Sequence, residues 1–163
     1  MKKSIAIALS ACTLVAGLAA CGNTADTTDK SSDAAVHQTQ TKNEVGKVVE
    51  TPNLDIQVKS VKSGYAESKD KNKQMLIVEI AAKNTSKIES GAGAADFRVK
   101  ADNGKTYEVY GLESKNFGDA IAAGKTLVGK GYYEIPKGTK AVTFYYAPAG
   151  EKKGEWSLTV PAK

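Results

Sequence analysis

The residues from Val45 onward predict an antiparallel β-sandwich. Apolar and polar side chains alternate with period two in several short runs, as they do in strands with one buried face. Turn-forming residues separate these runs at intervals of about 8–12 residues, which is typical of all-β sandwiches. No window of about eleven residues in this region carries an apolar stripe with helical spacing. These observations favour one all-β domain over residues 45–163.

The candidate strands follow one another along this domain. Leu54–Lys59 alternates cleanly, and Val61 resumes the pattern after a slip of one residue. Gln74–Asn84 is apolar on both faces at its start, which indicates a central strand. The remaining candidates are a short first run, Val45–Glu50, and Phe97–Ala101, Thr106–Tyr110, Thr126–Ile135, Ala141–Ala147 and Trp156–Val160. We expect about seven strands, a number typical of small β-sandwiches.

Asn103-Gly104 predicts a hairpin between Phe97–Ala101 and Thr106–Tyr110, because Asn-Gly between alternating runs is the strongest short-range hairpin signal. Ser114–Ala123 is the one segment of the domain that we expect to form a short helical turn.

A second hairpin is expected around Pro136-Lys137-Gly138-Thr139, where we predict that Ile135 pairs with Val142. Gly129 and Gly131 lie in its first strand and have no side chain to hold the pairing. A slip of one residue is therefore the main alternative to this register.

This hairpin predicts the places of four aromatic residues. Tyr133 and Phe144 are expected to face the core, and Tyr132 and Tyr145 to meet on the outer face. Such a tyrosine pair could simply stabilise the sheet, by about 0.2–1 kcal/mol. It could also be a binding platform for a glycan or protein partner, because tyrosine offers an apolar ring and a hydroxyl group.

The first twenty residues have the organisation of a secretion signal. Lys2 and Lys3 form a basic start, and the apolar run Ile5–Leu18 is shorter than the roughly 20 residues that a membrane-spanning helix needs. We therefore expect residues 1–20 to be a signal peptide that is removed from the mature protein.

Leu18, Ala19, Ala20 and Cys21 match a lipobox, in which the cysteine thiol receives a diacylglyceryl group. Lipidation at Cys21 would anchor the protein stably, because two acyl chains hold a protein on a membrane better than one. The expected location is the outer face of the cell membrane.

Residues 21–44 are expected to be the lipidated N-terminus and a flexible linker. Gly22–Glu44 is rich in Thr, Ser, Asp, Asn and Gln, and Val36 is its one branched apolar residue. Such a segment cannot bury enough apolar surface to offset the entropy lost on ordering.

Charge and cysteine content exclude some classes of protein. The chain has 23 Lys and Arg against 18 Asp and Glu, and Lys2 and Lys3 supply two of its five net positive charges. So small an excess does not indicate a nucleic-acid partner. The two cysteines are Cys12 and Cys21, and loss of Cys12 with the signal leaves no partner for a disulfide.

The chain offers few residues for catalysis. His37 is the only histidine and lies in the linker, where it is not held rigidly against a nucleophile. Gly124-Lys125-Thr126 leads into a strand, whereas a phosphate-binding loop opens a helix. Asp96, Asp102 and Asp119 leave a calcium site as an open alternative. We expect no catalytic residue, no metal and no cofactor.

Four segments together resemble a known family: Val45–Val48, Ile77–Ser86, Asp96–Tyr107 and Ala123–Tyr146. They are similar to the immunoglobulin-like domain of unknown function found in secreted lipoproteins, mostly of Gram-positive bacteria. That family resembles a mycobacterial immunoprotective extracellular protein. The resemblance implies an immunoglobulin-like sandwich over nearly all of Val45–Val160 and carries no activity or site residue with it.

The sequence thus favours a non-catalytic binding or interaction module, lipid-anchored at Cys21, with an envelope protein or glycan as its partner. One alternative is an envelope-associated modulator or inhibitor of another protein. The least favoured alternative is a hydrolase that uses carboxylates alone.

Overall fold

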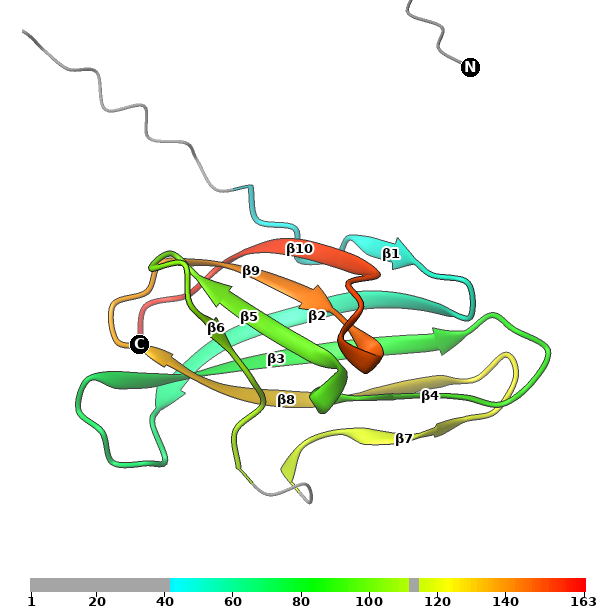
Figure 1. The fold of residues 1–163 in the computed structure, drawn as a ribbon, viewed down its shortest axis with the longest axis horizontal. Coiled ribbons are helices and arrows are strands. Elements are labelled where there is room, and N and C mark those ends of the chain that lie inside the picture. Colours follow the sequence, from blue (N-terminus) through cyan, green and yellow to red (C-terminus); the bar gives the residue numbers. More distant parts are fainter. Residues whose placement is uncertain (1–41, 112–114) are drawn as a thin grey trace, which may run out of the picture. The chain divides into compact units, whose positions relative to one another are not determined.

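The computed structural model describes residues 42–111 and 115–163, which form two four-stranded sheets and a two-stranded ribbon (Figure 1). The first sheet has the order β1 (Val48–Glu50), β2 (Leu54–Tyr65), β3 (Lys73–Asn84), β8 (Thr126–Pro136), and we name it the β3 sheet. The second has the order β10 (Gly154–Thr159), β9 (Ala141–Tyr146), β5 (Phe97–Ala101), β6 (Thr106–Tyr107), and we name it the β9 sheet. The ribbon pairs β4 (Ser90–Gly93) with β7 (Gly118–Ile121).

All of these strand pairings are antiparallel, and two short 3-10 turns, η1 (Ala94–Asp96) and η3 (Pro148–Gly150), are inserted between strands. The predicted immunoglobulin-like antiparallel β-sandwich is confirmed. The part of the chain that the structure describes holds no helix both long enough and apolar enough to cross a membrane.

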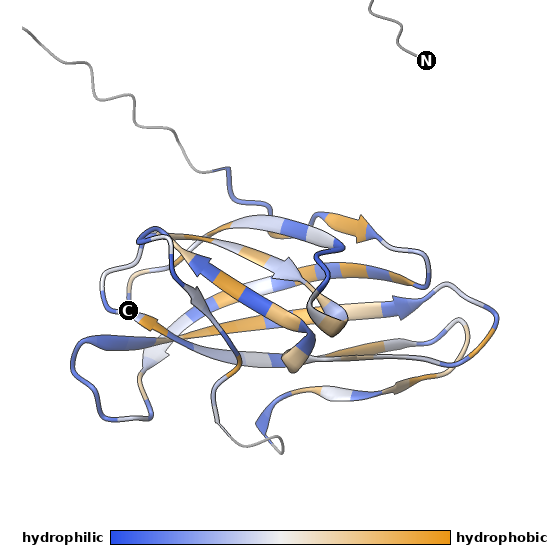
Figure 2. Cartoon of the chain, in the orientation of Figure 1, coloured by the Kyte–Doolittle hydropathy of each residue, from blue (hydrophilic) through white to orange (hydrophobic). Residues whose placement is uncertain are grey.

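The core lies between the inner faces of the two sheets. Phe97 on β5 stacks on Phe144 on β9 at a centroid distance of 5.1 Å, and Tyr133 on β8 meets Phe144 edge-on at 5.5 Å. Trp156 on β10 closes the cluster at 6.0 Å from Phe144. Apolar and polar residues alternate along β5 (Figure 2), and the apolar ones are those that face this cluster. Burial of these large rings, together with the aliphatic residues around them, stabilises the sandwich.

Two local features follow the sequence pattern. The slip after Val58 is a β-bulge: Val58 pairs with Ile80, whereas Ser60 already pairs with Glu79. The Asn103-Gly104 hairpin is also confirmed, since Val99 pairs with Tyr107, and Gly104 has the positive φ of +77° that a tight turn demands.

The second predicted hairpin is wrong. β8 and β9 belong to different sheets, so Ile135 pairs with Gln74 on β3, and Val142 pairs with Leu158 and Ala101. The turn after Pro136 crosses from one sheet to the other. β3 pairs with one edge of β8 from Thr126 to Pro136, and Tyr110, Asn116 and Phe117 bond to part of the other edge, where the expected hairpin would have placed β9.

Gly129 and Gly131 on β8 make room for the aromatic residues Phe117 and Tyr133. A Cβ atom added at Gly129 would lie 2.9 Å from Cγ of Phe117, and one added at Gly131 would lie 2.6 Å from the hydroxyl oxygen of Tyr133. These positions therefore need glycine because a ring occupies the space of the missing side chain.

The ribbon of β4 and β7 was not predicted. β7 forms inside Ser114–Ala123, where we expected a short helical turn, and β4 forms in a segment without apolar alternation. Gly93 and Gly118 pair across the ribbon, and a Cβ on Gly93 would come within 3.3 Å of the Gly118 Cα. The two glycines therefore let the backbones of β4 and β7 approach closely. Alternation of apolar residues could not predict this pairing, because it depends on the absence of side chains.

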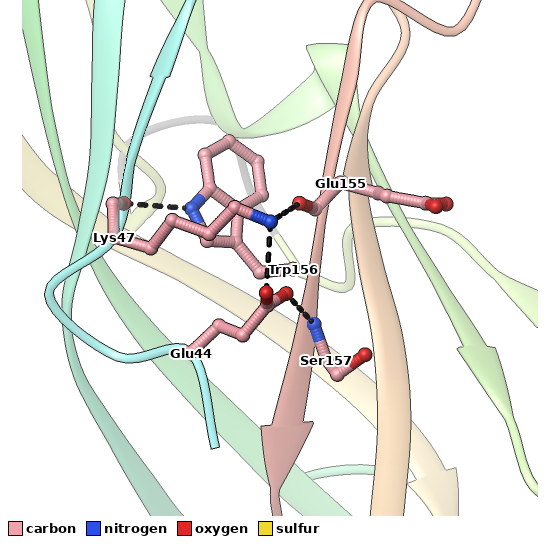
Figure 3. A network of polar contacts seen from close by, with 5 residues as sticks. All are labelled: Glu44, Lys47, Glu155, Trp156 and Ser157. Carbon is pink, nitrogen blue, oxygen red and sulfur yellow. Dashed lines mark hydrogen bonds and ion pairs between the residues drawn. The ribbon is translucent and has the colours of Figure 1, made fainter. Parts of the chain in front are cut away.

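The domain begins with residues that dock on β10 (Figure 3). The Glu44 backbone N–H donates to the Ser157 carbonyl at 2.8 Å, and the Ser157 N–H donates back to Glu44 Oε2 at 2.9 Å. Lys47 Nζ donates to Glu44 Oε1 at 2.9 Å, while the Trp156 indole N–H donates to the Lys47 carbonyl at 2.9 Å. Glu44, which the sequence places at the end of the linker, is thus part of the folded structure.

Candidate binding surfaces

The structure separates the two tyrosines of the expected platform. Their faces are predicted correctly: Tyr133 and Phe144 are fully buried, whereas Tyr132 and Tyr145 are half-buried. Their pairing is wrong, because Tyr132 lies in the β3 sheet and Tyr145 lies in the β9 sheet. Outward-facing residues of two stacked sheets point in opposite directions. The two rings therefore form no common platform.

Tyr132 lies at a covered edge of the β3 sheet. Its carbonyl accepts a hydrogen bond from the Tyr110 N–H at 2.7 Å, and its own N–H donates to Asn116 Oδ1 at 3.0 Å. The Phe117 N–H donates to the Lys130 carbonyl at 3.0 Å on the same edge. Tyr110, Asn116 and Phe117 therefore bond to backbone N–H and C=O groups along the edge of β8 that β3 leaves open. Covering a strand edge in this way is a common protection against pairing with another chain.

Tyr145 lies beside an open hollow on the outer face of the β9 sheet. The hollow has a volume of about 450 Å³ and is lined by Lys100, Gly104, Thr106, Thr143, Tyr145, Lys152 and Glu155. A second hollow of about 240 Å³ adjoins it and shares Lys100 and Thr143. We name this surface, defined by Lys100, Thr143, Tyr145, Lys152 and Glu155, the β9 face.

Most groups of the β9 face are polar and held on strands. On β9, Tyr145 is flanked by Arg98 on β5 and Glu155 on β10, which are its pairing partners. Lys152 and Glu155 form an ion pair at 2.7 Å, whereas the described residues provide no ion pair for Lys100. The surface therefore combines one aromatic ring, hydroxyl groups and a free ammonium group on a rigid sheet.

The acidic residues considered for calcium are used in local backbone contacts. Asp96 Oδ2 accepts a hydrogen bond from the Gly93 N–H at 2.8 Å, and Asp119 Oδ1 accepts one from the Ala120 N–H at 2.7 Å. Asp102 lies in the β5–β6 turn near the Lys140 N–H, at 3.5 Å. Within residues 42–111 and 115–163, no three His, Cys, Asp or Glu side chains gather in a group that could hold a metal ion.

The pKa shifts of Tyr133 and Glu44 have structural causes. Burial raises the pKa of Tyr133, whose hydroxyl donates to the Ala94 carbonyl at 3.0 Å, so this group stays protonated and supports η1. The hydrogen bonds from the Lys47 ammonium group and the Ser157 N–H lower the pKa of Glu44. Both groups act in the architecture of the domain.

The remaining predicted site residues, Leu18, Ala19, Ala20 and Cys21, lie outside the residues that the structure describes, as does His37. Sequence reasoning found Tyr145 but missed Lys100 and Lys152 beside it. Alternation in Phe97–Ala101 was the available signal for Lys100, because it placed this lysine on the outer face of its strand.

Three solved structures of bacterial proteins are similar in fold to this chain. A lipoprotein candidate of Bacillus subtilis, ycdA, has a TM-score of 0.57 at 19% identity, over 72% of this chain but only 39% of its own. The secreted protein MPT63 of Mycobacterium tuberculosis has a TM-score of 0.57 at 15% identity, over 70% of this chain and 94% of its own. The yjhA protein of Bacillus subtilis has a TM-score of 0.53 at 15% identity, over 74% and 100%.

At these identities the structural neighbours establish the fold alone. No curated protein of known sequence matches the chain. A family model described as "Domain of unknown function (DUF4352)" matches residues 43–155, a range that begins beside the docked Glu44 and spans both sheets. The expected family is thereby confirmed: this chain belongs to the DUF4352 family of immunoglobulin-like domains of unknown function.

Proposed function

We propose that this protein is a lipid-anchored protein of the outer cell surface whose β-sandwich is a non-catalytic binding module. The β9 face is its contact surface. The observation that carries this proposal is the pair of adjoining hollows that meet at Lys100 and Thr143, beside the Tyr145 ring. Strands position these side chains more firmly than loops would, as a recognition surface requires.

The chemistry of the β9 face favours a hydroxyl-rich ligand such as an envelope glycan. The Tyr145 ring offers an apolar face for a sugar ring, and its hydroxyl group offers a hydrogen bond. Thr143, Lys100 and Glu155 add donors and acceptors around it. The core of a protein–protein interface is more apolar than this surface. We therefore favour a glycan over the protein partner that the modulator hypothesis requires.

We infer the lipid anchor from the lipobox Leu18-Ala19-Ala20-Cys21. Mass spectrometry of the N-terminus of the membrane-extracted protein should find a diacylglyceryl group on Cys21. A Cys21→Ala variant should accumulate as unprocessed precursor or appear in the medium. An unmodified Cys21 in membrane extracts would contradict the anchor and leave the binding surface to be tested separately.

Co-sedimentation with purified cell-wall polysaccharide tests the binding surface. The full chain in non-ionic detergent should bind, and Tyr145→Ala should weaken binding by about ten-fold, or ~1.4 kcal/mol. Tyr132→Ala is the matched control, since it removes the same half-buried ring from the other sheet. Equal losses in both variants, or none in either, would contradict the proposal. Shortening of the polysaccharide during incubation would instead support the hydrolase alternative.

A further inference from the structure

We propose that the end of the sandwich around the β2–β3 loop binds the phosphate groups of a polyanion. A hollow of about 330 Å³ lies there, lined by Tyr65, Ala66, Lys69, Asp70, Lys71, Lys73, Lys137 and Lys163. We name it the lysine basin. The β2–β3 loop, the β8–β9 turn and the C-terminus form it at one end of the sandwich (Figure 1). It shares no residue with the β9 face, so this inference is independent of the proposed function.

The basin has a large excess of positive charge. Five of its eight lining residues are lysines, and Asp70 is the one acidic residue among them. Among the described residues, Lys73 pairs with Glu134 at 3.5 Å, but no ion pair involves Lys69, Lys71, Lys137 or Lys163. Like charges held together without counter-charges repel one another, and a concave site lined by one sign of charge attracts ligands of the opposite sign.

Two carboxylates near the basin accept hydrogen bonds from the backbone of the loop. Asp70 Oδ1 accepts a hydrogen bond from the Asn72 N–H at 2.8 Å. Glu134, 5% exposed, lies beneath the loop, where its Oε1 accepts from the Ser68 N–H at 2.8 Å. Both carboxylates therefore hold the backbone of the loop and keep their negative charge, but the five lysines of the basin outnumber them.

A strained residue and a hydrogen bond to the neighbouring turn define the conformation of the loop. Lys69 adopts a φ of +62°, a left-handed conformation that is costly for a residue with a Cβ. The Lys137 N–H donates to the Asn72 carbonyl at 2.8 Å, which ties the β8–β9 turn to the loop. Strained backbone held by surrounding hydrogen bonds is a common property of binding sites. These contacts hold the loop beside the β8–β9 turn, so that Lys69 and Lys137 line the same hollow.

An aromatic ring positions one of the ammonium groups. Lys163 Nζ lies 3.9 Å from the centre of the Tyr65 ring, and Tyr65 is 84% exposed. A cation held over an exposed ring keeps its remaining N–H groups available to an acceptor. The exposed Tyr65 ring therefore positions the Lys163 ammonium group and does not fill the core.

Phosphate is the anion that this arrangement fits best. Lysine ammonium groups are point-charge donors suited to phosphate oxygens, and several of them around one hollow suit a ligand with several phosphates. The volume lies within the range of about 300–1,000 Å³ found for ligand pockets. A concave site favours a phosphate-bearing chain over the flat surface of a bilayer.

Isothermal titration of the full chain in non-ionic detergent tests the proposal, with tripolyphosphate as the probe. The test variant is the triple Lys69→Gln, Lys71→Gln, Lys137→Gln, which leaves the Lys73 ion pair and the Lys163–Tyr65 contact intact. The control variant, Lys83→Gln, Lys87→Gln, Lys125→Gln, removes the same charge from exposed lysines elsewhere. A second arm replaces tripolyphosphate with phosphatidylglycerol added to the micelles, which distinguishes a lipid headgroup from a soluble phosphate.

The expected result is saturable binding that weakens with added salt. We expect the test variant to bind at least about ten-fold more weakly and the control variant to bind as the original protein does. Binding that is weakened in the test variant alone supports a phosphate site. Such binding to tripolyphosphate indicates a soluble phosphate as the ligand, and such binding to phosphatidylglycerol indicates a lipid headgroup. Absence of binding in both arms would overturn the proposal. Equal weakening in both variants would also overturn it, since net charge alone would then explain the binding.

Discussion

The two faces of the β9 sheet differ in what holds their side chains. On the inner face, Phe97, Phe144 and Trp156 are fully buried and contact one another. On the outer face, Tyr145 is half-buried beside an open polar hollow. Phe144 and Tyr145 are neighbours in sequence, yet one is fixed by packing and the other is free to contact a ligand. Stability and binding are therefore separable on a single strand.

Phe144→Ala should have the largest effect on the free energy of unfolding. The ring contacts Phe97, Tyr133 and Trp156, so its removal leaves a cavity that the sheets cannot close. We expect a loss of about 3–5 kcal/mol, measured by urea denaturation. A loss below about 1 kcal/mol would show that the inner face is less tightly packed than its contacts indicate.

Gly131→Ala should have the next largest effect. The new Cβ would lie 2.6 Å from the Tyr133 hydroxyl oxygen, and this ring is buried and bound to the Ala94 carbonyl. We expect a loss of about 1–3 kcal/mol from overpacking in the same denaturation assay. Gly64→Ala is the control, because its Cβ would meet Ile77 Cδ1 at an ordinary 3.5 Å. Equal losses at both positions would mean that strand glycines are generally required and that the Tyr133 ring is not the cause.

Tyr145→Ala should cost little stability while it removes binding. Cross-strand contacts on the outer face are worth about 0.2–1 kcal/mol, far less than the Phe144 ring. The same preparation should be measured for unfolding and for polysaccharide binding. A destabilisation as large as that of Phe144→Ala would show that the two faces are not separable.

Glu44→Gln should have the smallest effect, one that depends on pH. Lys47 and the Ser157 N–H lower the pKa of Glu44 in the folded state below its ordinary value of 4.5. The folded state therefore binds fewer protons there, so the stabilisation is present above this value and is lost as the pH falls through the lowered pKa. We expect a loss below about 1 kcal/mol at pH 7, where the original protein and the variant are compared by denaturation. The difference should shrink towards pH 3; a difference that grew on acidification would contradict this role.

The inner face could be predicted from the sequence because burial imposes alternation. Tyr133 and Phe144 were placed in the core, and Asn103-Gly104 identified the hairpin between β5 and β6, since both signals are local. The partner of β8 could not be predicted in this way. Alternation assigns a residue to a face but does not say which strand lies beside it, and the turn after Pro136 joins two sheets.

The two candidate sites were harder to predict because they are assembled from distant segments. Lys69 and Lys71 lie in one loop, Lys137 lies in a turn between sheets, and Lys163 follows the last strand. No local pattern brings these residues together. The antiparallel order of β2, β3 and β8 places the β2–β3 loop beside the β8–β9 turn. The Ser63 hydroxyl on β2 donates to the Pro161 carbonyl at 2.6 Å and holds the C-terminal residues beside them. In the same way, Lys100 joins Tyr145 only through the pairing of β5 with β9.

Hydrogen–deuterium exchange of the full chain, with and without saturating cell-wall polysaccharide, tests most directly whether the outer face of the β9 sheet is the binding surface. Backbone amides near a bound ligand exchange more slowly, and exchange reports each segment separately. We predict slower exchange in β5, β9 and the β9–β10 connection around Lys152, with no change in β8 around Tyr132. Slowing confined to β8, or an unchanged pattern in β5 and β9 despite bound polysaccharide, would contradict the account.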